Sequence, residues 1–136
     1  MAAAETAPRL SVVIPAYNEE LRLGPTIETV VAYLRAQPYA SELIVVDDGS
    51  SDRTADLARE RLDGAPIPHQ VLVNEHNRGK GYSVRRGMTR SAGELALFSD
   101  ADLSTPIEHT ADLMAAIEAG ADIAVGSRVA PGADIE

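Results

Sequence analysis

Two aspartates one residue apart follow an apolar segment in the stretch LALFSDADLSTP. Asp100 and Asp102 come directly after residues 95–99 and before turn-forming residues. Two carboxylates that share a site raise each other's pKa unless a cation offsets their repulsion. Hard oxygen ligands suit Mg²⁺ or Mn²⁺, and Mg²⁺ is typically held by one or two carboxylates together with substrate phosphates. The D-x-D spacing alone recurs by chance, but at the end of an apolar strand it indicates a divalent-metal site.

A second segment whose residue types could bind a ligand is NRGKG, residues 77–81. Its glycines, with Arg78 and Lys80, precede the start of an expected helix, where backbone N–H groups and a cation suit an anion such as diphosphate. A plain flexible turn is the alternative interpretation. The segment is not a P-loop, because position 74, where the pattern GxxxxGK[ST] requires its first glycine, is Asn.

Other polar side chains also follow apolar segments. The further acidic residues at such places are Glu19, Glu20, Asp47, Asp48 and Asp52. For Asp52 the capping of a helix is the better explanation, since Asp and Asn commonly cap helices and form turns. Tyr17 could stack on a base or simply cover the end of a strand. The three histidines, at 69, 76 and 109, share no metal-ligand spacing and are interpreted as surface or capping residues.

The chain alternates short apolar segments with helical ones. Apolar runs typical of strands occur at residues 10–14, 42–46, 69–75, 94–99 and 122–128. Segments with helical spacing or capping residues lie between them, at residues 24–38, 52–62, 79–93 and 104–120. This alternation predicts a parallel sheet covered by helices on both faces. In such sheets ligands bind beyond the carboxyl ends of the strands, where Asp100, Asp102 and NRGKG fall.

The spacing within each helical segment predicts which side chains face the core. These are Ile27, Val30, Val31 and Leu34 in the first helix, Ala55, Ala58 and Leu62 in the second, Val84, Met88 and Ala92 in the third, and Ile107, Ala111, Met114 and Ile117 in the fourth. Asp52 or Ser51 is expected to cap the second helix, and Ser104 or Thr105 the fourth.

Composition narrows the class of protein. The 136 residues fit one domain that can bury a core, with a net charge of −9 that disfavours nucleic acid as a partner. There is no cysteine, which excludes disulfides and thiolate metal sites. No apolar run approaches the roughly 18 residues that span a bilayer, and the first residues do not read as a secretory signal. We expect a flexible tail at residues 1–8, one domain at 9–130 and a frayed end at 131–136, in the cytoplasm.

Five segments together resemble a known family. LSVVIPAYNEE, ELIVVDDGSSDRT, NRGKGYSVRRGM, GELALFSDADLSTP and VGSR are similar, in order and spacing, to the nucleotide-binding part of family 2 glycosyltransferases. The sequence most resembles the dolichyl- or polyprenyl-phosphate glucosyltransferase-like members, with the mannosyl counterparts a step further away. The resemblance spans residues 10–128. It implies an α/β fold of the GT-A type, a Rossmann-like, mostly parallel sheet flanked by helices, that binds a nucleoside-diphosphate sugar such as UDP-glucose.

The resemblance also implies roles for individual residues. Pro15, Ala16, Tyr17 and Glu19 would line the nucleoside pocket, Val46 and Asp48 would hold the base, and Lys80 would lie near the base or the diphosphate. Asp100, with Ala101 beside it, would face the ribose or the metal, and Asp102 would bind the metal, either Mg²⁺ or Mn²⁺. Ser104 and Arg128 would lie close to the metal and the transferred sugar or acceptor phosphate. No catalytic residue is assigned.

The resemblance implies a reaction that transfers the sugar to a polyprenyl or dolichyl phosphate with inversion at the anomeric carbon. It also implies that the domain lies at the surface of a membrane. Family members usually continue well beyond GSR, so we expect the acceptor half to be lacking here and the chain to turn over poorly. The alternative is a nucleotide-sugar-binding module that does not turn over, and a homodimer is left open.

Nucleotidyl transfer is disfavoured because PAYNEE replaces the glycine-rich and basic loop after the first strand. A phosphoacceptor receiver domain is also disfavoured, because its acidic pair would follow the first strand, whereas the acidic pairs here follow the second and fourth strands.

Overall fold

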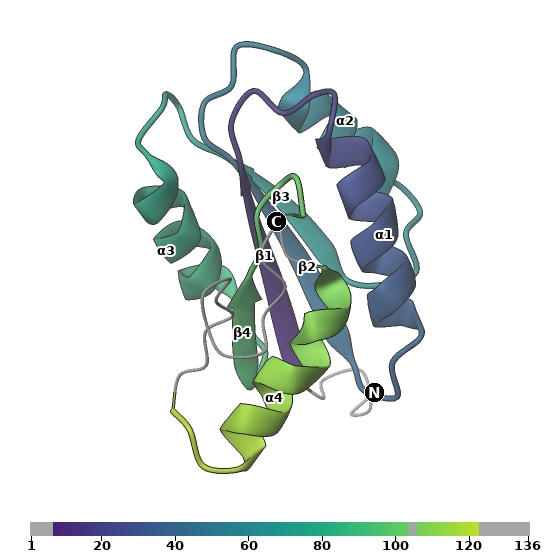
Figure 1. The fold of residues 1–136 in the computed structure, drawn as a ribbon. Coiled ribbons are helices and arrows are strands. Elements are labelled where there is room, and N and C mark those ends of the chain that lie inside the picture. The colour runs from purple at the N-terminus through teal and green to yellow at the C-terminus, as the bar shows by residue number, and fades with distance from the viewer. Residues whose placement is uncertain (1–6, 104–105, 123–136) are drawn as a thin grey trace.

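The computed structural model describes residues 7–103 and 106–122. Strands and helices alternate along these residues, as the sequence predicts (Figure 1). The strands are β1 (Leu10–Ala16), β2 (Ser41–Asp47), β3 (His69–Val73) and β4 (Leu95–Phe98). The helices are α1 (Leu23–Arg35), α2 (Thr54–Leu62), α3 (Lys80–Arg90), a short 3-10 helix (Ile107–His109) and α4 (Thr110–Glu118).

The four strands form one parallel sheet in the order β3-β2-β1-β4. Leu10 of β1 pairs with Ser41 of β2 on one side and with Leu95 of β4 on the other. The carboxyl ends of the strands therefore meet at one edge, at the upper end of Figure 1. This confirms the predicted parallel α/β sheet. The fifth strand expected at residues 122–128 lies, from residue 123 on, outside the described residues.

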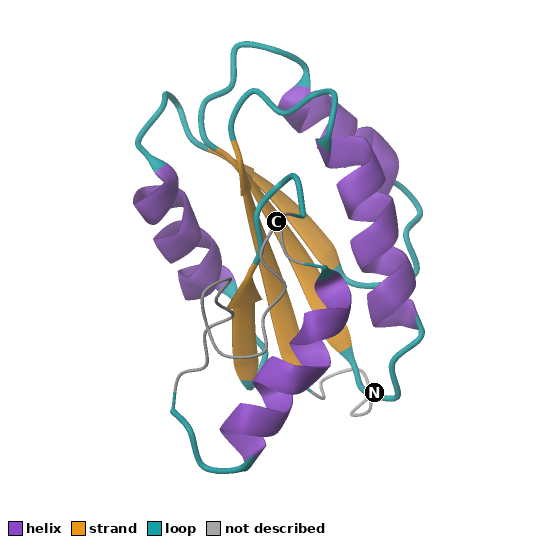
Figure 2. Cartoon of the chain, in the orientation of Figure 1, coloured by secondary structure: helices purple, strands orange, loops and turns teal. Residues whose placement is uncertain are grey.

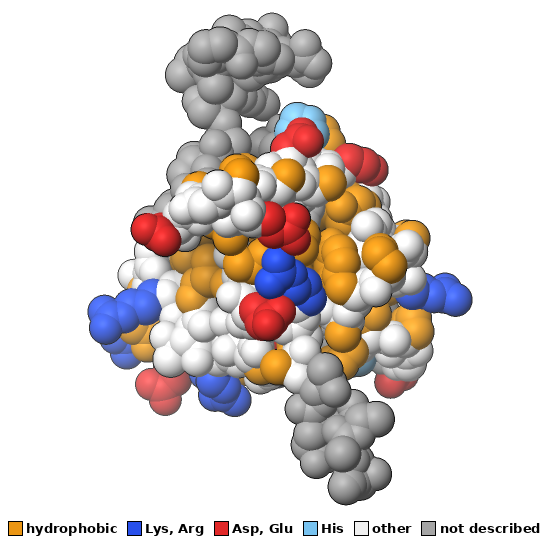
Figure 3. Space-filling model, turned by 90° about the horizontal axis from the view of Figure 1, so that it is seen from below, with side chains coloured by type: hydrophobic (Ala, Val, Ile, Leu, Met, Phe, Trp, Pro, Cys, Tyr) orange, Lys and Arg blue, Asp and Glu red, His pale blue; other side chains and the backbone are white. Residues whose placement is uncertain are grey.

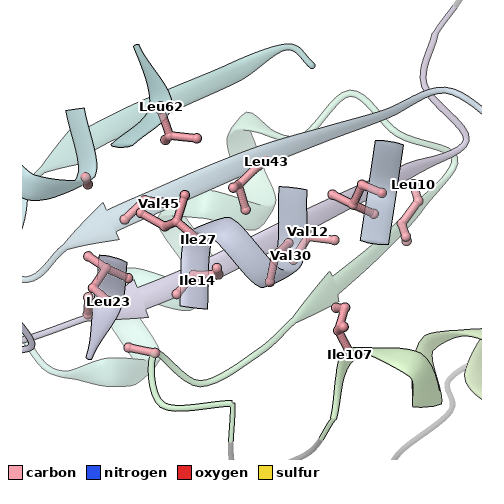
Figure 4. Close-up of a cluster of buried hydrophobic side chains, with 14 residues drawn as sticks. Leu10, Val12, Ile14, Leu23, Ile27, Val30, Leu43, Val45, Leu62 and Ile107 are labelled. Carbon is pink, nitrogen blue, oxygen red and sulfur yellow. The ribbon is translucent and has the colours of Figure 1, made fainter. Parts of the chain in front are cut away.

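Helices α1 and α2 lie side by side on one side of the sheet (Figure 2). The larger core cluster lies between these helices and the sheet. Ile27, Val30 and Leu34 of α1 are buried at helical spacing, which confirms the predicted inner face of that helix. They pack against Leu10, Val12 and Ile14 of β1 and against Leu43 and Val45 of β2, and most of this cluster is labelled in Figure 4. Ala58 and Leu62 of α2 and Ile107 of the 3-10 helix complete it.

Helix α3 covers the opposite face of β1 and β2, but through small residues. Its buried positions are Ser83 and Gly87, whereas Val84 and Met88 are only partly buried and Ala92 is exposed beyond the helix end. The predicted inner face is therefore correct only in part: Met88 packs against the smaller core cluster, but the buried positions are Ser83 and Gly87, which apolar spacing does not mark. A face without large side chains lets the helix backbone lie close to the sheet.

Strand β4 is covered on one face only within the described residues. Leu95 and Leu97 pack against the larger core cluster, whereas Ala96 is exposed and Phe98 is 47% exposed. The exposed pair lies on the α3 side of the sheet, since Phe98 pairs with Val13 of the smaller cluster. Continuous apolar sequence predicts burial on both faces, and here α3 sits over β1 and β2 rather than over β4.

The segment expected to form a fourth helix divides into the 3-10 turn and α4. Ile107 is buried as predicted and Met114 is partly buried, whereas Ala111 is exposed. The caps expected at Ser104 or Thr105 lie outside the described residues. In the described part of the chain, no helix combines the length and the apolar composition that crossing a membrane requires.

A buried carboxylate ties the amino ends of the strands to the end of α3. Glu42 of β2 accepts hydrogen bonds through Oε2 from the hydroxyl of Ser11 in β1 and from the backbone N–H of Ala92, both at 2.6 Å. The Ser11 hydroxyl in turn accepts the N–H of Gly93 at 2.8 Å. The turn between α3 and β4 is therefore fixed to two central strands.

Ion pairs at the surface also tie the amino end of β1 to neighbouring elements. Arg9, directly before β1, contacts Glu94 at 3.1 Å and Glu118 of α4 at 3.0 Å. The hydrogen bonds that the Arg9 guanidinium donates to the carboxylates of Glu118 and Glu94 raise its pKa, so it stays charged. Figure 3, which views the molecule from below Figure 1, shows basic groups between acidic side chains on this face.

Candidate functional site

A cleft of about 460 Å³ opens beyond the carboxyl ends of β1, β2 and β4. Most residues that the sequence analysis assigned to the nucleotide-sugar and metal sites line it. They are Pro15, Ala16, Tyr17, Glu19, Asp48, Lys80, Asp100, Ala101 and Asp102. The parallel sheet brings them together, because β1, β2 and β4 each deliver a loop to the same edge.

Three expected site residues are not placed in the cleft. Val46 is fully buried and packs in the smaller cluster between the sheet and α3, so its side chain faces Val13 and Gly87 rather than a ligand. Ser104 and Arg128 lie outside the described residues.

Asp48 is the centre of a hydrogen-bond network under the cleft. Its Oδ1 accepts from the side chain of Asn74 and the N–H of Arg78, both at 2.8 Å. Its Oδ2 accepts from the side chain of Asn77 at 3.1 Å and the N–H of Gly79 at 2.9 Å. Burial alone would raise the pKa of Asp48, but these hydrogen bonds outweigh it and hold the pKa below its usual range. A nucleobase that contacts this carboxylate would replace one of the four bonds.

This network changes the interpretation of the NRGKG segment. The N–H groups of Arg78 and Gly79, which were expected to suit a diphosphate, donate to Asp48 instead. Gly79 has a φ of 102°, a conformation that glycine adopts without strain, and α3 begins at the next residue. Lys80 is the cationic side chain of this segment that lines the cleft. The N-terminal end of α3, which carries a partial positive charge, lies beside it.

Asn77, Gly79 and Ser83 also line the cleft but were not among the assigned site residues. Ser83 is fully buried and accepts a hydrogen bond from Asn74 at 3.0 Å. Asn74 also accepts from Arg86 of α3 at 2.8 Å. A signal was present in the sequence, because Asn74 directly follows an apolar strand and Ser83 interrupts a helical segment, but neither pattern specifies a ligand.

Side chains of the loop between β2 and α2 hold the loop between β1 and α1. The N–H groups of Asn18, Glu19 and Glu20 donate to Ser50, Thr54 and Asp52, at 2.8, 2.9 and 3.3 Å. Asp52 also accepts the N–H of Thr54, the first residue of α2, at 2.9 Å. The N-cap position itself is Arg53, which makes no side-chain cap hydrogen bond, so the cap expected at Asp52 or Ser51 is misplaced by at least one residue. Burial would raise the pKa of Asp52, but hydrogen bonds from Thr54 and Glu20 lower it below its usual range.

Each aspartate after β4 lies beside a cation. Lys80 contacts Asp100 in a close ion pair, and its ammonium lies 5.8 Å from the centre of the Phe98 ring. Arg22, directly before α1, reaches Asp102 at 3.8 Å while its Nε donates to Glu19 at 2.8 Å. The carboxylate side chains are 42% and 40% exposed, so both are accessible from the cleft.

The described residues contain no group of three or more His, Asp or Glu side chains arranged to hold a metal ion. Asp100 and Asp102 offer two carboxylates, and Mg²⁺ is commonly held by one or two carboxylates together with water and the phosphates of a ligand. The oxygen donors and their exposure fit such an ion.

The fold and the cleft together define a Rossmann-like α/β domain that presents acidic and basic side chains at the carboxyl edge of a parallel sheet. The profile described as "Glycosyl transferase family 2" matches residues 11–136, and the chain belongs to that family.

Curated relatives include enzymes that act on lipid phosphates. The chain is 36% identical over 128 residues to a dolichol-phosphate mannosyltransferase of Pyrococcus furiosus, covering 94% of this chain and 35% of the relative. It is 40% identical over 103 residues to the human dolichyl-phosphate beta-glucosyltransferase, covering 71% of this chain and 32% of the relative. The chain thus spans about a third of the length of these relatives.

Solved structures share the fold. A mannosyltransferase of Pyrobaculum calidifontis in complex with GDP-Man and Mn²⁺ superposes with a TM-score of 0.65 at 26% identity, covering 78% of this chain and 31% of the other. Glucosyl-3-phosphoglycerate synthase of Mycobacterium tuberculosis, in complex with Mn²⁺, UDP and glucosyl-3-phosphoglycerate, gives 0.60 at 26% identity, covering 88% and 43%. The GT-A type of fold expected from the sequence is confirmed.

Proposed function

We propose that this chain is the donor-binding part of a glycosyltransferase that takes a nucleoside-diphosphate sugar, with UDP-glucose as the preferred donor. The observation that carries the proposal is the cleft, which gathers Tyr17, Lys80, Asp100 and Asp102 at the carboxyl edge of the sheet. Relatives named as dolichyl-phosphate beta-glucosyltransferases favour a glucose donor. The synthase structure that holds UDP supports uracil as the base.

Asp100 and Asp102 would hold the divalent cation, Mg²⁺ or Mn²⁺. The synthase and the mannosyltransferase were each solved with Mn²⁺, which supports a divalent ion as part of the donor complex. Such an ion, when bound, neutralises the charge that develops on the departing diphosphate.

The other residues of the cleft have complementary roles in this proposal. Lys80 would pair with the diphosphate, which would also lie near the N-terminal end of α3. Tyr17 is 48% exposed and lines the cleft, so its ring is available to stack on the base. Pro15, Ala16 and Glu19 would form the wall beside the nucleoside. Contact between Asp48 and the base would require an exchange of one of its hydrogen bonds.

The acceptor in this proposal is a polyprenyl or dolichyl phosphate. A phosphate monoester with a second pKa near ~6 is mostly dianionic at neutral pH and needs little help from a general base. Its oxygen would bond to the anomeric carbon from the face opposite the diphosphate, and the bond to the diphosphate would break with its electron pair on the departing oxygen. The product then has the inverted configuration. A lipid acceptor would place the domain at a membrane surface.

Calorimetric titration of the chain tests the donor site. UDP-glucose with Mn²⁺ is expected to bind more tightly than GDP-mannose with Mn²⁺, and EDTA is expected to abolish binding. Asp102→Asn should weaken metal-dependent binding about tenfold or more, as the loss of groups at metal sites commonly does. The matched control is Asp112→Asn, which removes the same charge from an exposed position on α4.

Absence of heat at millimolar UDP-glucose with Mn²⁺ would refute the donor site. Tighter binding of GDP-mannose would overturn the choice of UDP-glucose, and binding that survives EDTA would remove the metal from the proposal. Equal affinity of Asp102→Asn and the control would exclude Asp102 as a ligand.

A further inference from the structure

We infer that Ser50, Asp52 and Thr54 are positioning residues of the donor site, with the buried hydroxyl of Thr54 at their centre. They set the path of residues 18–20 and thereby place Tyr17 and Glu19 on the cleft wall. This inference rests on the proposed function for its consequence in binding, whereas its structural part can be tested without any ligand.

Three backbone donors of the loop after β1 are satisfied by side chains from outside the loop. Asn18 has a φ of 51°, in the left-handed region that Asn adopts more readily than most residues, so the chain turns sharply out of the sheet. Beyond that turn three successive N–H groups point to side chains of the β2–α2 loop rather than to a neighbouring strand. The contact is reciprocal, because the side chain of Asn18 accepts the N–H of Ser51 at 2.9 Å.

Thr54 is the most constrained of the three acceptors. It is fully buried, and its hydroxyl donates its one proton to the carboxylate of Asp52. The oxygen lone pairs are therefore directed to the N–H of Glu19, at 2.9 Å. A hydroxyl that donates to a charged partner is a better acceptor, so the Asp52–Thr54–Glu19 chain is polarised in one direction.

Glu19 transmits this constraint to the cleft. Its carbonyl accepts the N–H groups of Arg22 and Leu23, at 3.0 and 2.8 Å, which begins α1. Its carboxylate accepts from Arg22, which also approaches Asp102. Within the described residues, Thr54 is the group that accepts the backbone N–H of Glu19, and loss of that bond frees the wall formed by Tyr17 and Glu19.

The test compares Thr54→Val, which keeps the shape and removes the hydroxyl, with Thr54→Ser, which keeps the hydroxyl. Amide hydrogen exchange of the ligand-free chain, read residue by residue by NMR, should show the Glu19 N–H exchanging about tenfold faster in Thr54→Val. The N–H of Asp48, bonded to the carbonyl of Ala16 at 2.8 Å, serves as an internal reference that should not change. Thr89→Val makes the same replacement at an exposed position of α3 and controls for the loss of a hydroxyl.

Titration with UDP and Mn²⁺ then measures the consequence in the cleft. Thr54→Val should bind about five- to tenfold more weakly, because the ligand must order the loop, and Thr54→Ser should restore most of the affinity. Ser50→Ala, at a less buried position, should give a smaller loss and provides a second variant if Thr54→Val does not fold.

The outcomes separate the two proposals. Unchanged exchange at Glu19 in Thr54→Val, or a uniform increase at every amide, would overturn the positioning role whatever the chain binds. Faster exchange at Glu19 with unchanged affinity would show that the loop is held but does not serve the donor site. If the unaltered chain binds no UDP, the proposed function fails while the exchange result still decides the structural part.

Discussion

Gly87 offers a sharp test of how closely α3 lies against the sheet. An ideal Cβ at this position would lie 2.4 Å from Cγ1 of Val13 and 3.2 Å from Cγ2 of Val46. Both valines are fully buried in the central strands, so neither can move aside easily. Gly87→Ala therefore forces the helix outward or distorts the packing of β1 and β2.

The expected size of the effect combines two opposing contributions. Replacing Gly by Ala within a helix stabilises it by up to about 1 kcal/mol, whereas forcing one methyl group into a packed core costs about 1–3 kcal/mol. Gly81 lies near the start of the same helix, and a Cβ there meets no atom of the described residues within 4 Å. Gly81→Ala should thus be neutral or stabilising, and the free energies of unfolding of the two variants should differ by about 1–3 kcal/mol in favour of Gly81→Ala.

Urea unfolding followed by far-ultraviolet circular dichroism measures this difference, since the sequence contains no tryptophan for a fluorescence signal. The slopes of the two transitions should agree, so that the midpoints report stability alone. If Gly87→Ala proves as stable as Gly81→Ala, the close approach of α3 to β1 is wrong.

Two further predictions concern the charged groups of the cleft. The pKa values of Asp48 and Asp52 are held below the ordinary value, so the unfolded chain takes up protons more readily than the folded one. The free energy of unfolding should therefore fall as the pH drops below about 4, and it should fall less steeply in Asp48→Asn than in the unaltered chain. Urea unfolding at several pH values measures this dependence. An equal fall with pH in both proteins would contradict the network. Lys80 is the sole lysine of the sequence, so an amine-reactive reagent read by mass spectrometry of peptides reports on it. UDP with Mn²⁺ should slow its labelling about tenfold, whereas Mn²⁺ alone should not, and equal labelling in all conditions would remove Lys80 from the diphosphate site.

The regular elements were predictable where the pattern of apolar residues carries the packing. Ile27, Val30 and Leu34 recur at helical spacing and are buried as expected, and the apolar runs form the parallel sheet. The inner face of α3 was not predictable in this way, because Ser83 and Gly87 pack by being small. Phe98 likewise reads as a core residue, although its burial depends on which helix lies above β4.

The cleft was predictable as a meeting place of loops but not in its hydrogen bonding. Parallel strands must bring Tyr17, Lys80 and Asp100 to one edge, whatever the details of the loops. Whether Arg78 and Gly79 turn their N–H groups to a ligand or to Asp48 depends on backbone angles that residue types leave open. The roles assigned to Ser104 and Arg128 stay predictions, since both lie outside the described residues.

The carboxylate of Glu42 also bears on how α3 can respond to a ligand. It anchors the Ala92 end of the helix to β1 and β2, while Gly79 and Lys80 at the far end border the cleft. The cleft end of α3 is held as well, because the N–H of Gly79 donates to Asp48 and Ser83 accepts from Asn74. With both ends of the helix fixed, ligand binding should leave its axis in place and change side-chain positions, such as that of Lys80, instead.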